Sequence, residues 1–466
     1  MKKILGSLIF SLFMVLAANG QSFNVDGIYY SVLEDVESQC AVTYSAVDDT
    51  PYSGSVAVPE SVTYDSKTYR VTRVNPYAFS NSDELLEVTL PASIESIGRN
   101  AFSNCASLTS VVLSENLQAI PEYVFLGCVV LETVSIPASV TEIADYAFSR
   151  CISLSEIELP DGVSHIGDGA FSQCNSLKQI VIPDGIEYLG SQAFEDCYQL
   201  DSIIIPSNIT IIEPYLCSGC KNLTSLELPA NLEIIGTGAF KSCAALSSVQ
   251  LPTSLKLISD RAFELCTALH EVDFQSDNLK IDEYAFAGCS FVNIDFSGVT
   301  EIGTAAFSNN SALSTIIFPE TVKRIENRAF DNCNAVTNVY CYAMTPPTLA
   351  KTAFENSIFQ QATLYLVNGN KLIYAQTPPW NLFIKMEDTL LDSYVDSIED
   401  SYLDLRVENN TIVLSGLTAP SYYAVYTLGG VLTKEGIISP GEAIDGFEKG
   451  SLYILNVNGR VWKLAF

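Results

Sequence analysis

The feature that most constrains this chain is a phenylalanine that recurs every 23 residues, with few exceptions, through most of its length. It stands at Phe79, Phe102, Phe125, Phe148, Phe171, Phe194, Phe240, Phe263, Phe286, Phe307, Phe330 and Phe354, and Cys217 fills the slot between Phe194 and Phe240. A fixed period of this length is typical of solenoids, in which each coil buries its apolar face only against its neighbours. Counting Cys217, we predict 13 stacked coils.

The coil that starts at Phe148 explains the pattern. Residues 154–159 read L-x-x-I-x-L, which predicts a short strand with inward apolar side chains, and Pro160 ends it because proline cannot donate to a ladder. Gly162 and Gly167 are expected at turns with positive φ. Stacked strands of this kind predict a solenoid with a parallel β-sheet.

The residue pattern of the repeat resembles that of a known family. The segment from Ile182 to Cys197 matches I-P-x-x-V-x-x-I-G-x-x-A-F-x-x-C, with Ile186 at the Val position and Leu189 at the Ile position. This pattern resembles the BspA-like class of bacterial leucine-rich repeats, over about residues 21–388. The resemblance implies a curved solenoid in a family whose members are typically secreted or surface-displayed, some of them as adhesins for host or bacterial partners.

Ten of the 13 cysteines lie three residues after the phenylalanine slot and therefore form a column through the stack. They are Cys105, Cys128, Cys151, Cys174, Cys197, Cys220, Cys243, Cys266, Cys289 and Cys333. Stacked neighbours are within disulfide reach. Buried free thiols that pack as small apolar side chains explain the spacing equally well, and we favour them. Because the total is odd, at least one thiol is unpaired within the chain.

Composition offers little for catalysis or metal binding. His165 and His270 are the only histidines and stand four to five coils apart. His270 follows Cys266 by four residues, but its slot faces outward and the cysteine slot inward, so a cysteine–histidine pair is not expected. No D-x-D-x-D-G loop or G-G-x-G-x-D repeat is present for calcium. We predict a non-enzymatic protein with no catalytic residues, no cofactor and no metal site.

The charge narrows the class of partner. Lys+Arg total 24 against Asp+Glu 54, a net charge of −30. Such a chain repels phosphate backbones, so nucleic acid is excluded as a partner. We expect an extracellular protein or glycan, host matrix included, as the partner.

Two outward slots of the strand pattern form a ribbon along one face of the coils. In four central coils these slots hold Glu156, Glu158, Gln179, Val181, Ser202, Ile204, Ser225 and Glu227. Val181 and Ile204 are adjacent apolar residues bracketed by Glu158 and Glu227, which favours a partner-binding patch. A simpler explanation stays open, because β-branched residues suit any exposed strand. We predict an adhesin-like binding protein; the alternative is a structural or self-associating surface protein without a specific ligand.

The N-terminal segment resembles a targeting signal rather than a folded element. Residues 1–20 combine a basic start, an apolar run and small residues before Gln21, which predicts a cleaved secretory signal peptide. An N-terminal anchor is the alternative. No second apolar run of membrane-spanning length follows, so the cleaved chain is not expected to cross a membrane. We assign residues 21–78 to a lead-in and cap and residues 79–388 to the repeats and their end.

After the repeats the composition changes. Residues 389–404 are rich in Asp and Glu without Lys or Arg, which predicts an acidic linker. Residues 405–466 hold β-type segments at 405–414, 422–428, 452–457 and 461–466 between glycine turns, which predicts a small β-sandwich.

This last segment resembles the C-terminal sorting domain of type IX secretion cargo. The matching positions are Gly416, Val425, Tyr426, Gly429, Gly430, Gly450, Tyr453 and Lys463. The resemblance implies a sorting and attachment role, at the cell surface or outer membrane. The alternative is a domain that caps the last coil, since an open solenoid end exposes strand edges.

Overall fold

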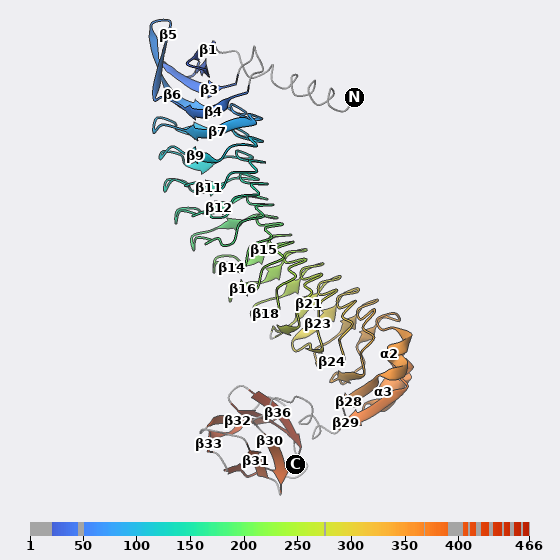
Figure 1. The fold of residues 1–466 in the computed structure, drawn as a ribbon. Coiled ribbons are helices and arrows are strands. Elements are labelled where there is room, and N and C mark those ends of the chain that lie inside the picture. Colours follow the sequence, from blue (N-terminus) through green and yellow to red (C-terminus); the bar gives the residue numbers. More distant parts are fainter. Residues whose placement is uncertain are drawn as a thin grey trace. The chain divides into compact units, whose positions relative to one another are not determined.

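The computed structural model describes residues 21–44, 51–274, 276–367, 369–389, 404–408, 411–415, 421–427, 432–439, 442–447, 452–457 and 460–465 (Figure 1). The predicted signal peptide and all but the ends of the predicted acidic linker lie outside these residues. The chain divides into two compact units: residues 1–336 with 347–356, and residues 337–346 with 357–466.

The first unit begins with a small mixed sheet, the lead-in sheet. Its order is β1 (Ser22–Val25), β2 (Ile28–Val32), β3 (Gln39–Thr43), β6 (Lys67–Val74) and β5 (Ser61–Tyr64). Asp26 and Gly27 join β1 to β2 with φ angles of 52° and 84°, as a tight hairpin turn of type I′ requires. The ring of Phe23 stacks on Tyr64 with 4.4 Å between centroids and anchors the sheet.

On one side of the coils, the isoleucine side, two-residue strands form parallel ladders. The first is β10 (Ala119–Ile120), β11 (Glu142–Ile143), β12 (His165–Ile166) and β13 (Tyr188–Leu189). The second is β15 (Ile211–Ile212), β17 (Ile234–Ile235), β19 (Leu257–Ile258), β21 (Leu279–Ile281), β23 (Val299–Ile302), β25 (Arg324–Ile325) and β27 (Thr348–Leu349). Most partners are 23 residues apart, as in Glu142 opposite His165, so the predicted parallel-sheet solenoid is confirmed. The register shifts once, where Val299 and Glu301 pair with consecutive residues of β21 and Thr300 is extra.

The opposite side, the leucine side, carries the predicted L-x-x-I-x-L strands, and its ladder is interrupted. Three strands pair near the start: β4 (Ser53–Ala57), β7 (Glu84–Thr89) and β9 (Ser110–Val112). Further on, β14 (Ser202–Ile204) pairs with β16 (Ser225–Glu227), β18 (Ser248–Gln250) with β20 (Glu271–Asp273), and β22 (Asn293–Asp295) with β24 (Thr315–Phe318). A bent stack keeps the ladder spacing of about 4.8 Å on one side only. The L-x-x-I-x-L pattern predicts the main sheet on the leucine side, but the longer ladders lie on the isoleucine side.

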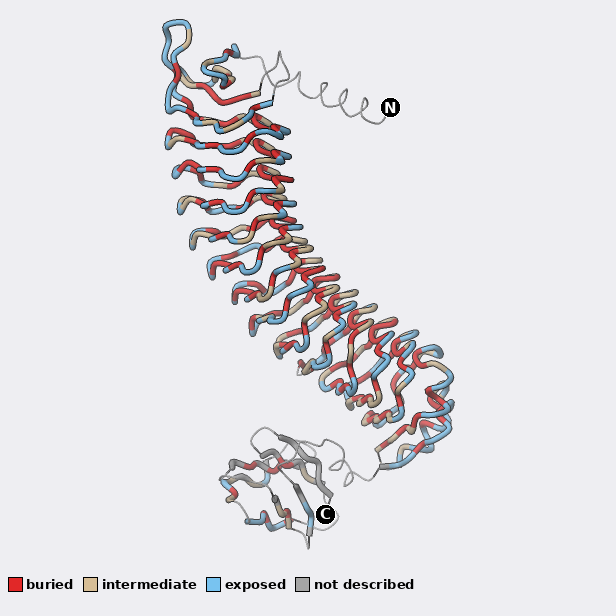
Figure 2. Tube along the Cα trace, in the orientation of Figure 1, coloured by how far each residue is buried: buried red, intermediate tan, exposed pale blue. Residues whose placement is uncertain are grey.

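The core consists of columns that run through the coils, and buried residues recur at the same place in each coil (Figure 2). Neighbouring phenylalanine rings are stacked, with centroids 5.0 Å apart for Phe79–Phe102 and 5.4 Å for Phe148–Phe171. Stacking of this kind adds about 0.5–1.5 kcal/mol per pair beyond simple burial. The phenylalanine period therefore fixes both the fold and its register.

Twelve of the 13 coils, all except that of Phe354, also contain two left-handed backbone positions, two residues before and two residues after the phenylalanine slot. The earlier slot is occupied by Tyr77, Asn100, Tyr123, Tyr146, Gly169, Gln192, Tyr215, Gly238, Arg261, Tyr284, Ala305 and Arg328, all with positive φ. The expectation of positive φ at Gly162 and Gly167 was wrong, since neither has it. Gly167 is needed for space instead, because a Cβ there would lie 2.6 Å from the backbone nitrogen of Asp145.

The second unit contains the end of the repeats. Its elements are β26 (Asn338–Cys341), α2 (Asn356–Gln361), β28 (Thr363–Val367), α3 (Lys371–Gln376), the 3-10 turn η1 (Trp380–Leu382) and β29 (Lys385–Thr389). Strands β26, β28 and β29 pair in parallel. Trp380 and Tyr374 are fully buried beside them, with ring centroids 5.3 Å apart.

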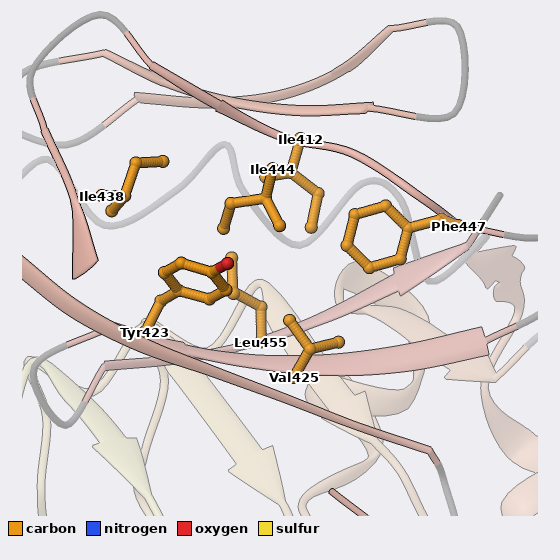
Figure 3. Packing of buried hydrophobic residues seen from close by; sticks show 7 residues of the cluster. All are labelled: Ile412, Tyr423, Val425, Ile438, Ile444, Phe447 and Leu455. Carbon is orange, nitrogen blue, oxygen red and sulfur yellow. The ribbon is translucent and has the colours of Figure 1, made fainter. Parts of the chain in front are cut away.

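The C-terminal residues of this unit form two antiparallel sheets. One is β30 (Asp404–Glu408), β31 (Thr411–Ser415) and β34 (Ala443–Ile444), and the other is β33 (Leu432–Ile438), β32 (Ser421–Thr427), β35 (Leu452–Val457) and β36 (Arg460–Ala465). Side chains from both sheets point toward one another, among them Ile412, Ile444, Val425 and Leu455 (Figure 3). The segment 405–414, expected as one strand, is a β30–β31 hairpin, and β33 and β34 were not anticipated.

Candidate functional site

The predicted ribbon lies on the leucine side of the first unit, and its two apolar residues are well exposed. Val181 is 81% exposed and Ile204 is 61% exposed. Glu158 and Glu227, which bracket them along the ribbon, are also exposed. The ribbon therefore presents a small apolar centre between carboxylates.

Alternation along the chain positions these side chains. Ile180 and Ile182 on either side of Val181 are buried, and Ile203 and Ile205 on either side of Ile204 are buried. Successive residues of an extended segment point to opposite faces, so the inward isoleucines hold their neighbours outward. In the β14–β16 pair, Ile204 lies opposite Glu227.

The remaining ribbon residues lie on the same face of four consecutive coils. Glu156, Gln179 and Ser225 are exposed. Ser202 is half-buried, its hydroxyl donates to the Asp201 carboxylate at 2.9 Å, and its backbone lies opposite Ser225. The structure thus brings together all eight residues singled out in the sequence, and their role in binding stays a prediction.

The backbone of the ribbon differs from the expected continuous sheet. Glu156 is joined to Thr133 by an isolated bridge, and residues 177–183 belong to no strand. Lys178 keeps the coils in contact, because its N–H donates to Ser155 at 3.5 Å and its carbonyl accepts from Asp201 at 3.1 Å. Val181 therefore projects from an irregular segment between two paired regions.

A stacked pair of tyrosines on the second unit was not predicted from the sequence. Tyr340 stacks on Tyr365 with 4.6 Å between ring centroids. Tyr365 was missed because it follows α2, where the 23-residue register ends. The extended patterns of β26 and β28, both of alternating inward and outward residues, were the available signal.

The cysteine column is structural, and its chemistry differs from simple apolar packing. All 13 cysteines are buried free thiols. Each thiol of the column donates to the main-chain carbonyl of the coil before it, for example Cys151 to Phe125 and Cys174 to Phe148, both at 3.2 Å. Where the column lacks cysteine, the amide of Asn310 donates to Phe286 at 3.0 Å and to Phe307 at 2.9 Å. Burial raises the pKa of the Cys151 thiol well above its usual value, which disfavours the nucleophilic thiolate there.

The two histidines lie in different coils of the stack, and each contacts residues close to it. His165 stacks on Tyr188 with ring centroids 4.7 Å apart. Nδ1 of His270 is 2.9 Å from the carbonyl of Ala268, whereas the Cys266 thiol donates inward to Phe240. The geometry supports no cysteine–histidine pair at this position.

The lead-in sheet borders a hollow of about 740 Å³ that the sequence analysis did not anticipate. Its walls come from the β1–β2 hairpin, β4 and β5, with Asp26, Tyr29, Tyr52, Ser53 and Ser55 among the lining residues. The Tyr52 hydroxyl donates to Thr43 at 2.6 Å and accepts from the N–H of Tyr29 at 3.0 Å, so the ring is fixed in place. This hollow offers hydroxyls and one carboxylate, but no group arranged for catalysis.

Among the described residues, no group of three or more His, Cys, Asp or Glu side chains is placed to hold a metal ion. Within the same part of the chain, every helix is too short or too polar to span a bilayer.

Comparison with protein families gives one match. The model described as "BspA type Leucine rich repeat region (6 copies)" matches residues 60–154, 141–270 and 233–361, which together span residues 60–361 of the 466. No curated protein matches the chain.

Solved structures of bacterial leucine-rich repeat proteins are similar to the chain. A leucine-rich repeat protein from Bacteroides ovatus is 25% identical with a TM-score of 0.52, covering 74% of this chain and 100% of its own. The leucine-rich repeat protein of T. pallidum is 27% identical with a TM-score of 0.33, covering 48% and 91%. A leucine-rich cell surface protein from Faecalibacterium prausnitzii is 19% identical with a TM-score of 0.43, covering 80% and 96%.

Proposed function

Because the chain belongs to the BspA-type leucine-rich repeat family, we propose that it is a non-catalytic binding protein that acts outside the cytoplasm. The ribbon of Glu156, Glu158, Gln179, Val181, Ser202, Ile204, Ser225 and Glu227 contacts a protein or glycan partner. The observation that carries this proposal is the pair of adjacent exposed side chains, Val181 at 81% and Ile204 at 61%. Adjacent apolar side chains on a polar surface are typical of an interaction site.

The charge around the pair indicates the chemistry of the partner. Glu158 and Glu227 flank the apolar centre, and the whole chain carries −30. An apolar patch with a carboxylate rim is complementary to a surface with an apolar centre and basic rim, and the rim charges mainly raise the association rate. We infer a partner with exposed Lys or Arg around an apolar or sugar-ring contact.

The location outside the cytoplasm rests on two segments of the sequence. Residues 1–20 have the layout of a secretory signal peptide. The C-terminal sheets carry several positions of the sorting-domain resemblance, with Val425 and Tyr426 in β32, Tyr453 in β35 and Lys463 in β36. Attachment at the cell surface through this segment is part of the proposal.

The test is binding of the purified chain, residues 21–466, to a panel of extracellular-matrix proteins, host glycans and whole bacterial cells. Saturable binding that weakens as salt rises is expected, because the rim is acidic. Absence of saturable binding across the panel, by a chain whose circular dichroism shows the fold, would favour the alternative of a structural or self-associating surface protein. Concentration-dependent mass in light scattering would then identify self-association directly.

A further inference from the structure

One coil of the stack departs from the pattern, because Cys217 occupies the slot that holds a phenylalanine in the other coils. The ring of Phe194 stacks on Phe171 at 5.7 Å, and the ring of Phe240 stacks on Phe263 at 5.3 Å. The ring column is therefore interrupted at Cys217. The isoleucine-side ladder is interrupted at the same junction, between β13 and β15.

Cys217 is also half of a C-x-x-C sequence, Cys217-Ser218-Gly219-Cys220. The N–H of Cys220 donates to the carbonyl of Cys217 at 3.2 Å, and Gly219 has a φ of 77°. These four residues thus form a turn, which holds its first and last Cα atoms within about 7 Å of each other. Disulfides need about 4.4–6.8 Å between Cα atoms, so the turn brings the two cysteines into range.

The thiol of Cys217 differs from the thiols of the column in its hydrogen bonding. Cys197 donates to the carbonyl of Phe171 at 3.2 Å, and Cys243 donates to the carbonyl of Cys217 at 3.2 Å. Among the cysteines of the repeat column and its phenylalanine slot, all of which the structure describes, Cys217 is the one that donates to no main-chain carbonyl.

We propose that Cys217 and Cys220 form a disulfide within this coil when the chain folds in an oxidising compartment, so the inference rests on the proposed export. A low-molecular-weight disulfide such as oxidised glutathione is the oxidant. One cysteine thiolate attacks it and releases one glutathione, and the second thiolate displaces the other glutathione from the mixed disulfide. The Cys217–Cys220 bond forms, the two cysteines lose two electrons, and both protons end on the two released glutathione thiols.

The order of events follows from sequence distance and burial. Two residues separate the cysteines, so the bond closes a short loop before the coils stack. Once the coils are stacked, both side chains are fully buried, and a reductant in solution reaches the bond only after local opening. Oxidation removes the thiol proton that Cys220 donates to the carbonyl of Phe194 at 3.1 Å, and it adds a covalent bond within the coil that lacks the ring.

The test refolds the full chain in oxidised glutathione, which makes the result independent of export. The chain is then alkylated in denaturant without reductant, digested and analysed by mass spectrometry. The expected peptide contains Cys217 and Cys220, carries no alkyl group and is two hydrogen atoms lighter than the dithiol. Cys217→Ser abolishes this species, and Cys197→Ser, one coil away in the same column, leaves it unchanged.

Three results would overturn the inference. Full alkylation of all cysteines in the refolded wild-type chain shows that the coil stays reduced. A bond between stacked neighbours, such as Cys197–Cys220 or Cys220–Cys243, shows that the column rather than the turn decides pairing. Persistence of the light peptide in Cys217→Ser shows a different partner; where that variant does not fold, mapping of the wild-type bond alone decides.

Discussion

Truncation of one ring in the phenylalanine column should destabilise the stack more than its size alone suggests. Phe171 is fully buried and lies between two rings, with centroids 5.4 Å from Phe148 and 5.7 Å from Phe194. Loss of a buried phenylalanine to alanine costs about 3–5 kcal/mol. Each ring pair contributes about 0.5–1.5 kcal/mol beyond burial. Part of that is already contained in the truncation values, so we expect Phe171→Ala to lower the free energy of unfolding by about 4–6 kcal/mol.

The assay is urea unfolding followed by far-UV circular dichroism, with native-state hydrogen exchange to locate the loss, since repeat arrays unfold in parts. The matched control is Tyr188→Ala in the next coil, an aromatic side chain that is 36% exposed and stacks on His165 alone. It should cost under about 1.5 kcal/mol. Equal effects of the two variants, or a loss below about 2 kcal/mol for Phe171→Ala, would refute the claim that the ring column carries the stack.

Three further predictions test the internal contacts. Gly167→Ala should cost about 1–3 kcal/mol because its Cβ would lie 2.6 Å from a backbone nitrogen, whereas Gly162→Ala, with its nearest neighbour at 3.7 Å, should be neutral; equal thermal melting of both would contradict the account. Asn310→Leu should cost about 1–3 kcal/mol in urea unfolding, because the buried carbonyl of Phe286 loses the Asn310 amide and that of Phe307 keeps only the Cys333 thiol. Asn310→Cys should retain most of the stability; the reverse order would show that the amide is not the donor that matters. Burial and the hydrogen bond to Asp168 raise the pKa of Tyr188 to about 12, so its contribution to stability is full below the unfolded pKa of about 10 and is lost as pH rises through 12. Urea midpoints above pH 10 should therefore fall less for Tyr188→Phe than for the wild-type chain. An equal fall of the urea midpoint with pH in both chains would contradict the raised pKa of Tyr188.

The parts of the fold that follow from repeated residue types could be predicted. Phe148 and its equivalents fix the period, and a constant cysteine three residues later fixes the second column. The pairing of Glu142 with His165 shows that the 23-residue step is also the register of the ladder. Buried columns have strict size requirements, so their residues repeat and are visible in one sequence.

The rest depends on backbone geometry that many residues can adopt. The two left-handed positions of a coil hold residues as different as Tyr146 and Arg150, so no single residue type signals them. The two glycines singled out in the sequence, Gly162 and Gly167, lie at neither position. The gap in the leucine-side ladder at 177–183 could not be predicted either, because Ile180 and Val181 have the same strand-like pattern as the paired coils.

The candidate site could be predicted in position but not in detail. Alternation placed Val181 and Ile204 outward, and both are exposed. The hollow beside Tyr29 and Tyr52 lay beyond prediction, because its walls come from strands that are distant in the sequence and meet only in the folded lead-in sheet.

The most direct test of the central claim is the affinity of a panel partner for a chain with Val181→Asp and Ile204→Asp. The matched control is Val112→Asp, at the same ribbon slot three coils away and 53% exposed. Each substitution removes an apolar contact worth about 1.5–3 kcal/mol and adds a carboxylate that must be desolvated, so we predict at least about a 100-fold increase in Kd for the double variant. We expect Val112→Asp to change the Kd by less than about threefold. Equal Kd values for the wild-type chain and the double variant, with the fold of both intact, would contradict the assignment of binding to this ribbon.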